Sequence, residues 1–352
     1  MLLDGIILKC SASLKTHRTH SAIYNILKGA KAIQTILDVH LYQLKNVYGI
    51  YPSLHKKDFD DHIKQLIGSG HLLLLDENKI ERTPRGEELQ KKCEKTSAYH
   101  YFNGFQYTGI SEPFIERLLL TIQTFTNKQV NNNQFIPVVD DIDIQHWVRQ
   151  YYHRHKQSTS ALLKNLHDEL YKLLEQMPEN EARLFVDRLT GYNHYGSSLY
   201  QLHHKYHLSI HDVPLILEGI THRFLSIVSQ EKKAYPMLNT FIDGIYRFHF
   251  LTNSAKKTYR LYQKGYQADE IATMRKLKVN TIHDHLVEIA LYDSDFTYQP
   301  YVTQTEAQII LEAIQKTDSY KLKDIKALIN ADITYFQIRL VLALMGNING
   351  RM

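Results

Sequence analysis

Residues 254–290 read SAKKTYRLYQKGYQADEIATMRKLKVNTIHDHLVEIA, and they contain the clearest structural pattern in the chain. Residues 256–264 have the three- and four-residue apolar spacing of a helix and are rich in basic side chains. Gly265 follows that run, and glycine readily adopts the left-handed backbone that ends a helix. A second run of helical spacing covers residues 269–277. The stretch therefore predicts two short helices separated by a glycine.

A third helix is predicted directly after them. Asn280 is a favourable N-cap residue, and Ile282, Leu286 and Ile289 share one helical face. Ala272 has the small side chain that lets the second and third helices cross closely. This order predicts a helix-turn-helix. The glycine that usually occupies the turn is absent, and Lys276 stands in its place.

The same stretch is basic, with seven Lys and Arg residues against four Asp and Glu, a net charge of +3. In helix-turn-helix proteins, cations near the turn contact DNA phosphates and the third helix faces the base edges. An alternative is that the basic run is only a solvated face. The candidate DNA-contacting residues are Lys256, Lys257, Arg260, Arg275, Lys276, Lys278, Thr281 and His283.

Any DNA binding by this module is expected to be non-specific. The third helix is expected to present Thr281, His283 and Asp284 outward, and the carboxylate would weaken phosphate contacts. If about four cations meet phosphates, log K should fall with log salt at a slope near −3.6. Two capping boxes, Thr303 with Glu306 and Thr334 with Gln337, predict two further helices after the module.

The N-terminal part has the element order of a winged helix. Helical spacing predicts three helices, over residues 21–27, 33–44 and 57–67. Strand-like runs over residues 72–75 and 79–82 follow as a hairpin. A proline in the first helical turn then opens another helix.

The third helix of a winged helix is the one that enters the DNA major groove. Here that helix also contains Asp58, Asp60 and Asp61, which would oppose contact with phosphates. The unit is therefore predicted to bind either DNA or a protein. Secondary candidate residues for DNA contact are Lys56, Lys57, Lys64, Arg82 and Arg85.

The middle of the chain is predicted to be all-helical, and one stretch in it, residues 201–213, follows helix-turn-helix spacing. His207 stands there where glycine is usual. His203, His207 and His211 are four residues apart and would share one face of an unbroken helix, as zinc ligands can. Leu208 and Ser209 break that helix, and no Cys lies near. No metal site and no cofactor are therefore predicted.

Composition limits the function classes. The 352 residues have a formal net charge of +5, which excludes a histone-like polycation and an acidic disordered chain. Cys10 and Cys93 are too few for a disulfide scaffold. No apolar run approaches 18 residues, and no basic segment precedes the apolar start, which Asp4 interrupts. A cytoplasmic protein without membrane attachment is predicted, with association with the nucleoid as a variant of that location.

No nucleotide-binding glycine loop, nuclease signature or nucleophile elbow occurs, so the chain is predicted not to be an enzyme. The predicted fold is mainly α with three parts. They are a winged-helix-like domain with one β-hairpin over residues 1–98, an all-helical domain over 99–250, and a helix-turn-helix domain over 251–352.

The residues of the last part resemble a known domain. They are Glu270-Ile271-Ala272-x-x-Arg275-x-Leu277, then Thr281-Ile282-x-x-His285-Leu286, then Tyr335-x-x-Ile338-Arg339-x-Val341-x-Ala343. This pattern resembles the helix-turn-helix domain at the carboxyl ends of RecQ-type helicases. With its length and winged-helix-like start, the whole chain is similar to the YpbB family of bacteria, which is encoded next to a RecQ helicase.

The resemblance implies a non-enzymatic accessory protein that binds a RecQ-type helicase, and weakly DNA, in DNA repair or recombination. It implies no catalytic residues. A helix-turn-helix transcription regulator is the alternative function. The sequence does not indicate an oligomeric state.

Overall fold

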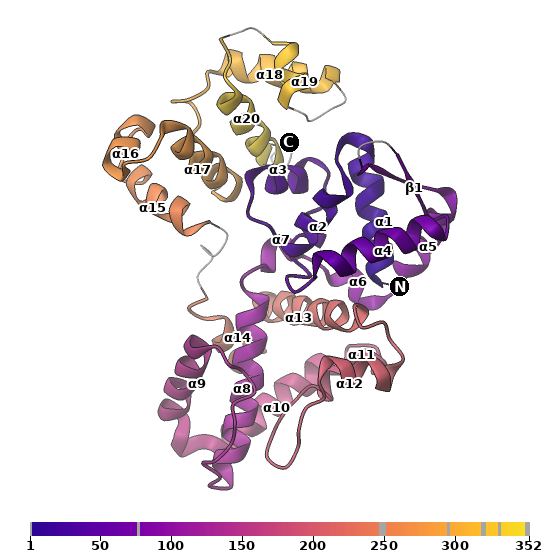
Figure 1. Ribbon diagram of the computed structural model, residues 1–352. Helices are drawn as coiled ribbons and strands as arrows, with labels where there is room; N and C mark the ends of the chain where they lie inside the picture. Colours follow the sequence, from indigo (N-terminus) through magenta and orange to yellow (C-terminus); the bar gives the residue numbers. More distant parts are fainter. Residues whose placement is uncertain are drawn as a thin grey trace. The chain divides into compact units, whose positions relative to one another are not determined.

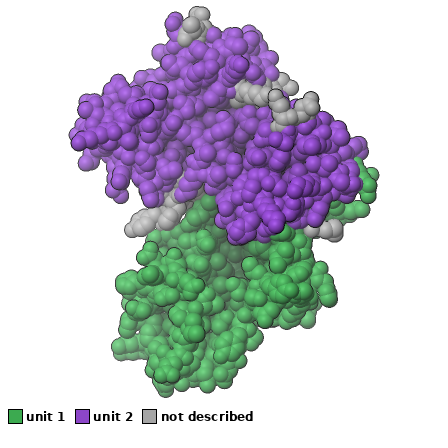
Figure 2. Space-filling view, viewed as in Figure 1, with its two compact units in different colours: residues 1–7, 85–247 green, residues 8–84, 248–352 purple. Residues whose placement is uncertain are grey.

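A computed structural model describes residues 2–75, 78–245, 251–293, 296–317, 322–329 and 332–348, with no account of the side chains of 346–348. The fold is mainly α with one β-hairpin near the N-terminus, as predicted (Figure 1). The chain forms two compact units (Figure 2). Unit 1 comprises Met1–Ile7 and Arg85–Arg247, and unit 2 comprises Leu8–Pro84 and Phe248–Met352. These units group the chain differently from the three predicted domain ranges, which stay a prediction.

The N-terminal part of unit 2 has the predicted order of three helices and a hairpin. The elements are α2 (His20–Lys28), α3 (Ile33–Leu41), α4 (Lys56–Gly68), β1 (Leu72–Leu74) and β2 (Ile80–Arg82). The strands are antiparallel, with Leu73 opposite Glu81. Phe59, Ile63 and Leu66 are buried on one face of α4, because their spacing places them on one side of the helix.

A further helix, α1 (Leu2–Leu14), precedes these elements and was not predicted. It contributes residues to both units. Ile6, Ile7, Leu8 and Cys10 are each 0% exposed, so α1 is a core helix.

The C-terminal part of unit 2 consists of α15 (Asn253–Tyr262), α16 (Ala268–Arg275), α17 (Val279–Tyr292), α18 (Gln304–Thr317), α19 (Leu322–Ala327) and α20 (Tyr335–Ile348). Helix α17 lies at the centre of this part and packs against α15, α16 and α20. Helix α3 of the N-terminal part also packs against α17 and α20. Both predicted capping boxes form, since Thr303 and Glu306 bond reciprocally, as do Thr334 and Gln337.

Unit 1 is helical, as predicted for the middle of the chain. Its helices are α5 (Pro84–Cys93), α6 (Ser97–Tyr101), α7 (Gly104–Tyr107), α8 (Ser111–Gln129), α9 (Ile142–His155), α10 (Thr159–Leu174), α11 (Glu179–Val186), α12 (Leu199–Tyr206), α13 (Asp212–Gln230) and α14 (Pro236–Ile242). Helices α13 and α6 meet at Gly219, where a Cβ atom would lie only 2.8 Å from the Cβ of Ala98. The glycine is therefore required for this close packing.

Candidate nucleic-acid interface

The turn of the C-terminal helix-turn-helix is centred on Lys276. Its backbone is left-handed, with φ 53° and ψ 44°. The Lys276 amide donates to the carbonyl of Thr273 at 3.2 Å, and the Leu277 amide donates to that of Ala272 at 3.0 Å. These two bonds satisfy the last carbonyls of α16. Lysine thus adopts the conformation that glycine usually provides at this turn.

Helix α17 is largely covered. Ile282, Leu286 and Ile289 are each 0% exposed, so the predicted apolar face is the one that packs inward. The sequence predicted that His283 and Asp284 face outward, whereas in the structure both side chains contact α20. The His283 ring stacks on Phe336 with the ring centroids 3.9 Å apart, and Asp284 forms an ion pair with Arg339.

These contacts limit what α17 can read. A recognition helix needs a free face to reach base edges in the major groove. Burial lowers the pKa of His283, which disfavours its charged form. Thr281 is half-buried at the N-terminal end of the helix. The N-terminal end of α17 is therefore the part that a nucleic acid can reach, and the rest of the helix is not.

Arg275 has a structural role that the sequence did not indicate. Its guanidinium donates to the carbonyl of Ser254 at 2.9 Å, to the Ser254 hydroxyl at 3.0 Å and to the Thr258 hydroxyl. The Thr258 hydroxyl lies 2.9 Å from Nδ1 of buried His285. Arg275 therefore connects α16 to α15 through both terminal nitrogens of its guanidinium.

The basic helix α15 is held at its start by a carboxylate from α17. The Thr252 hydroxyl accepts from the amide of Ala255 at 3.1 Å and caps α15. Glu288 accepts from both the amide and the hydroxyl of Thr252. Glu288 is only 3% exposed, and burial raises the pKa of its carboxyl. This anchoring positions α15 on α17.

Four of the predicted cations are exposed and have no hydrogen bond or ion pair to any described residue. They are Lys257, Arg260, Lys276 and Lys278. Lys264, which follows the end of α15, shares this property and was not among the candidates. We call these five residues the basic edge. Lys256 differs from them because it is half-buried. Burial, and then the charge of Lys256, lowers the pKa of Lys31.

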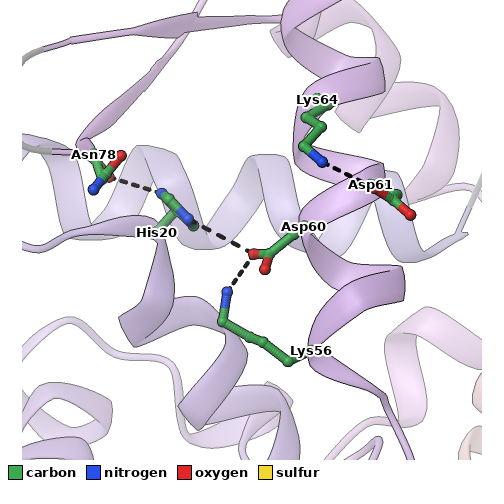
Figure 3. Close-up of polar contacts among 6 residues, drawn as sticks. All are labelled: His20, Lys56, Asp60, Asp61, Lys64 and Asn78. Atoms are coloured by element: carbon green, nitrogen blue, oxygen red, sulfur yellow. Dashed lines mark hydrogen bonds and ion pairs between the residues drawn. The ribbon is translucent and has the colours of Figure 1, made fainter.

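The N-terminal candidates are mostly paired (Figure 3). Lys56 forms an ion pair with Asp60, and Lys64 lies 3.2 Å from Asp61. Nε2 of His20 lies 3.8 Å from Asp60, and its Nδ1–H donates to the carbonyl of Asn78 at 2.8 Å. The aspartates predicted to oppose phosphates thus engage two of the lysines expected to bind them.

The remaining N-terminal candidates lie on three different elements. Lys57 is exposed on α4 and has no partner among the described residues. Arg82 is half-buried on β2, and Arg85 is exposed on α5 in unit 1. The basic edge is therefore the stronger candidate interface.

The helix-turn-helix spacing in unit 1 also produces a real turn. Helix α12 ends at Tyr206, and His207 is left-handed with φ 52°. The Leu208 amide donates to the carbonyl of His203 at 3.2 Å. The predicted break between His203 and His211 thus exists. Within the described part of the chain, no three His, Cys, Asp or Glu side chains are placed to hold a metal ion.

The net charge of the chain lies in unit 2. By sequence, unit 2 has 24 Lys and Arg residues against 18 Asp and Glu, and unit 1 has 18 against 19. The excess of +6 in unit 2 favours binding of a polyanion there. Over the described residues, no helix has the length and apolarity that crossing a bilayer requires.

Comparisons with known proteins also find a helix-turn-helix domain in this part of the chain. A family model described as a helix-turn-helix domain matches residues 254–342. The chain is 28% identical over 342 residues to Protein YpbB of Bacillus subtilis (strain 168), which covers 96% of each chain. No solved structure matches. The chain is therefore a YpbB-like protein with a helix-turn-helix domain at residues 254–342.

Proposed function

We propose that this protein is a non-enzymatic accessory factor of a RecQ-type DNA helicase that also binds DNA through the basic edge. The observation that supports DNA binding is the set of five exposed cations around the helix-turn-helix that have no partner among the described residues. Phosphates are the groups that such cations bind without regard to base sequence. The helicase partnership, and a role in repair or recombination, rest on the resemblance of the C-terminal part to the domain at the ends of RecQ-type helicases.

A transcription regulator is the less favoured function. Sequence-specific repressors read bases with the third helix of the motif. Here α20 occupies the side of α17 that holds His283 and Asp284. Contacts limited to phosphates suit an accessory protein, which needs affinity for DNA of any sequence.

DNA binding is tested by the dependence of affinity on salt. If about four of the five cations meet phosphates, the slope of log K against log salt should be near −3.6. Replacing Lys276 and Lys278 with Gln should reduce that slope by about 1.8, because two phosphate contacts are lost. A matched control replaces Lys232 and Lys233, which are exposed in unit 1, with Gln. An unchanged affinity and slope in the first variant would show that the basic edge does not bind DNA.

The helicase partnership is tested by co-purification with the RecQ-type helicase of the same organism. Association that survives nuclease treatment supports a direct protein contact. Absence of association at micromolar concentration, with and without DNA, would contradict it.

A further inference from the structure

A pocket in unit 1 has a chemistry that the proposed function does not use. It lies between α8, α9 and the segment of residues 130–141 that connects them, and it encloses about 320 Å³. Helices α8 and α9 lie side by side (Figure 1). Leu120 and Val148, both buried, line it from the two helices and belong to one apolar cluster. The volume is at the lower end of the range of about 300–1,000 Å³ for small-molecule sites.

One wall of the pocket is held in place by a buried glutamine. Gln123 of α8 is 6% exposed. Its side-chain amide donates to the carbonyl of Ile136 at 2.9 Å and accepts from the amide of Val138 at 2.8 Å. Gln145 of α9 donates to the carbonyl of Val139 at 2.8 Å. These bonds fix the connecting segment against both helices, so the pocket is part of the folded unit and not a loose loop.

Among the described residues, the pocket is lined by two cations, Lys128 and Arg149, and by no Asp or Glu. His153 also lines it. Arg149 is exposed and has neither a hydrogen bond nor an ion pair with any described residue. Lys128 bonds to the neutral side chain of Asn133. No described carboxylate of the pocket lining compensates the positive charges of Lys128 and Arg149. An anion is the ligand that would balance these charges.

The carboxylates of Glu112, Glu116 and Asp141 do not line the pocket. Burial, and then the charges of Glu112 and Asp141, raise the pKa of Glu116, near the start of α8, to about 7. Residues at the end of α8, in contrast, meet residues at the end of α9, since Nζ of Lys128 lies 5.8 Å from the ring centroid of Tyr152. The pair thus has an acidic end and a basic end, and the pocket extends to the basic end.

Two aromatic side chains complete the lining. Tyr152 and Phe135 are both half-buried. The ring of Tyr152 is supported by an edge-to-face contact with Phe125, at 5.3 Å between centroids and with the ring planes at 78°. A half-buried, supported ring is a surface on which a flat ligand can stack, and stacking on aromatic side chains is how proteins hold unpaired bases.

We propose that this pocket binds a nucleoside monophosphate, with its phosphate near Lys128 and Arg149 and its base on Tyr152. Anionic and aromatic groups in one ligand of this size match the cations, rings and volume together. The nucleotide has two sources, a free mononucleotide or one residue of a single-stranded nucleic acid. The inference concerns unit 1 and is independent of the basic edge in unit 2.

The experiment titrates the full-length protein with AMP and with a labelled single-stranded oligothymidylate of about ten nucleotides. The variants are Arg149→Gln, Lys128→Gln, Tyr152→Leu and Tyr152→Phe. The control is Lys164→Gln, an exposed lysine of α10 that has no partner among the described residues. We expect Tyr152→Leu to weaken binding about tenfold or more, and Tyr152→Phe to retain it because the ring remains. Removing both cations should reduce the salt slope for the oligonucleotide by about 1.4.

The two sources give different results, and both support the site. Comparable affinity for AMP and the oligonucleotide identifies a free nucleotide, whereas a gain of about a hundredfold for the oligonucleotide identifies a single strand. Binding that is unchanged in Arg149→Gln and Tyr152→Leu would overturn the inference, as would no binding of either probe at about 1 mM. The Lys276 and Lys278 double variant distinguishes this site from the proposed function, because it should leave AMP binding intact.

Discussion

At the scale of single residues, Lys276 combines two properties that substitution can separate. Its left-handed backbone costs an L-residue roughly 1–2 kcal/mol, and glycine avoids that cost but loses more entropy on folding. Lys276→Gly should therefore raise the free energy of unfolding by about 0.5–1 kcal/mol and also weaken DNA binding, because a cation is lost. Denaturant unfolding and DNA titration measure the two effects.

Lys276→Ala is the control for this prediction. It removes the same charge but keeps a Cβ atom, so it should weaken DNA binding without stabilising the fold. A Lys276→Gly protein that is less stable than the original chain would contradict the assignment of strain to this turn.

Arg275 should behave in the opposite way to its neighbours in the basic run. Its hydrogen bonds to Ser254 and Thr258 join α16 to α15. Arg275→Gln should lower the free energy of unfolding by about 1–2 kcal/mol, since hydrogen bonds of a charged group are lost. The salt slope of DNA binding should stay unchanged, whereas Lys278→Gln should reduce it by about 0.9. A reduced slope in Arg275→Gln would show that this residue also reaches phosphates.

At the scale of elements, the placement of α15 depends on its first turn. Thr252→Ala removes the N-cap and one of the two donors to buried Glu288. It should cost about 1 kcal/mol, the usual loss at such a cap, and it should weaken DNA binding by loosening the helix that presents Lys257 and Arg260. Thr252→Ser keeps the hydroxyl and should restore both properties. Loss of stability in the serine variant as well would point to the methyl group and not to the cap.

One turn geometry recurs in three helix pairs of the chain. Gln43, His207 and Lys276 are all left-handed, and each is followed by a leucine. In each case the leucine amide donates to the carbonyl five residues before it, as the Leu44 amide does to Val39. Local sequence predicted the turns at His207 and Lys276 because their neighbours follow helix-turn-helix spacing. The helix predicted over residues 33–44 continued through Gln43, whereas α3 ends at Leu41.

Local sequence patterns predicted individual helices and strands correctly. They failed where contacts between residues distant in sequence determine the position of a side chain. The hairpin, both capping boxes and the inward face of α17 follow from residues near one another in sequence. Helix α1 was missed because most of its own residues are apolar or small, so no polar face marks a helical period. Phe336 of α20 stacks on His283, and the hydrogen-bond partners of Arg275 lie on α15. Residue spacing within the helix-turn-helix motif cannot predict either contact. Lys128 and Arg149 were not predicted as a pair because separate helices bring them to one pocket.

At the scale of the whole molecule, the two units should respond to pH in opposite directions. In unit 1, the pKa of Glu116 is raised from 4.5 to about 7, by burial first and then by Glu112 and Asp141. The folded unit therefore binds more protons than the unfolded chain between these values, and its stability should fall as pH rises through that window. In unit 2, burial lowers the pKa of His40 from 6.5 to about 3 and also lowers the pKa values of His283 and His285. At these histidines the unfolded chain binds more protons, so their contribution to stability should fall as pH decreases below 6.5.

The single tryptophan makes this prediction measurable, because Trp147 lies in unit 1. Trp147 fluorescence during denaturant unfolding should report a higher midpoint at pH 5 than at pH 8, and Glu116→Gln should remove most of that difference. Far-ultraviolet circular dichroism follows both units and should show a second transition that moves to lower denaturant at pH 5. The lowered pKa of His40 alone corresponds to a loss of about 2 kcal/mol of stability at that pH, since the unfolded histidine is then largely protonated and the folded one is not. Parallel movement of the two transitions would show that one group of titrating residues dominates both units, and an unchanged fluorescence shift in Glu116→Gln would exclude this carboxyl as its source.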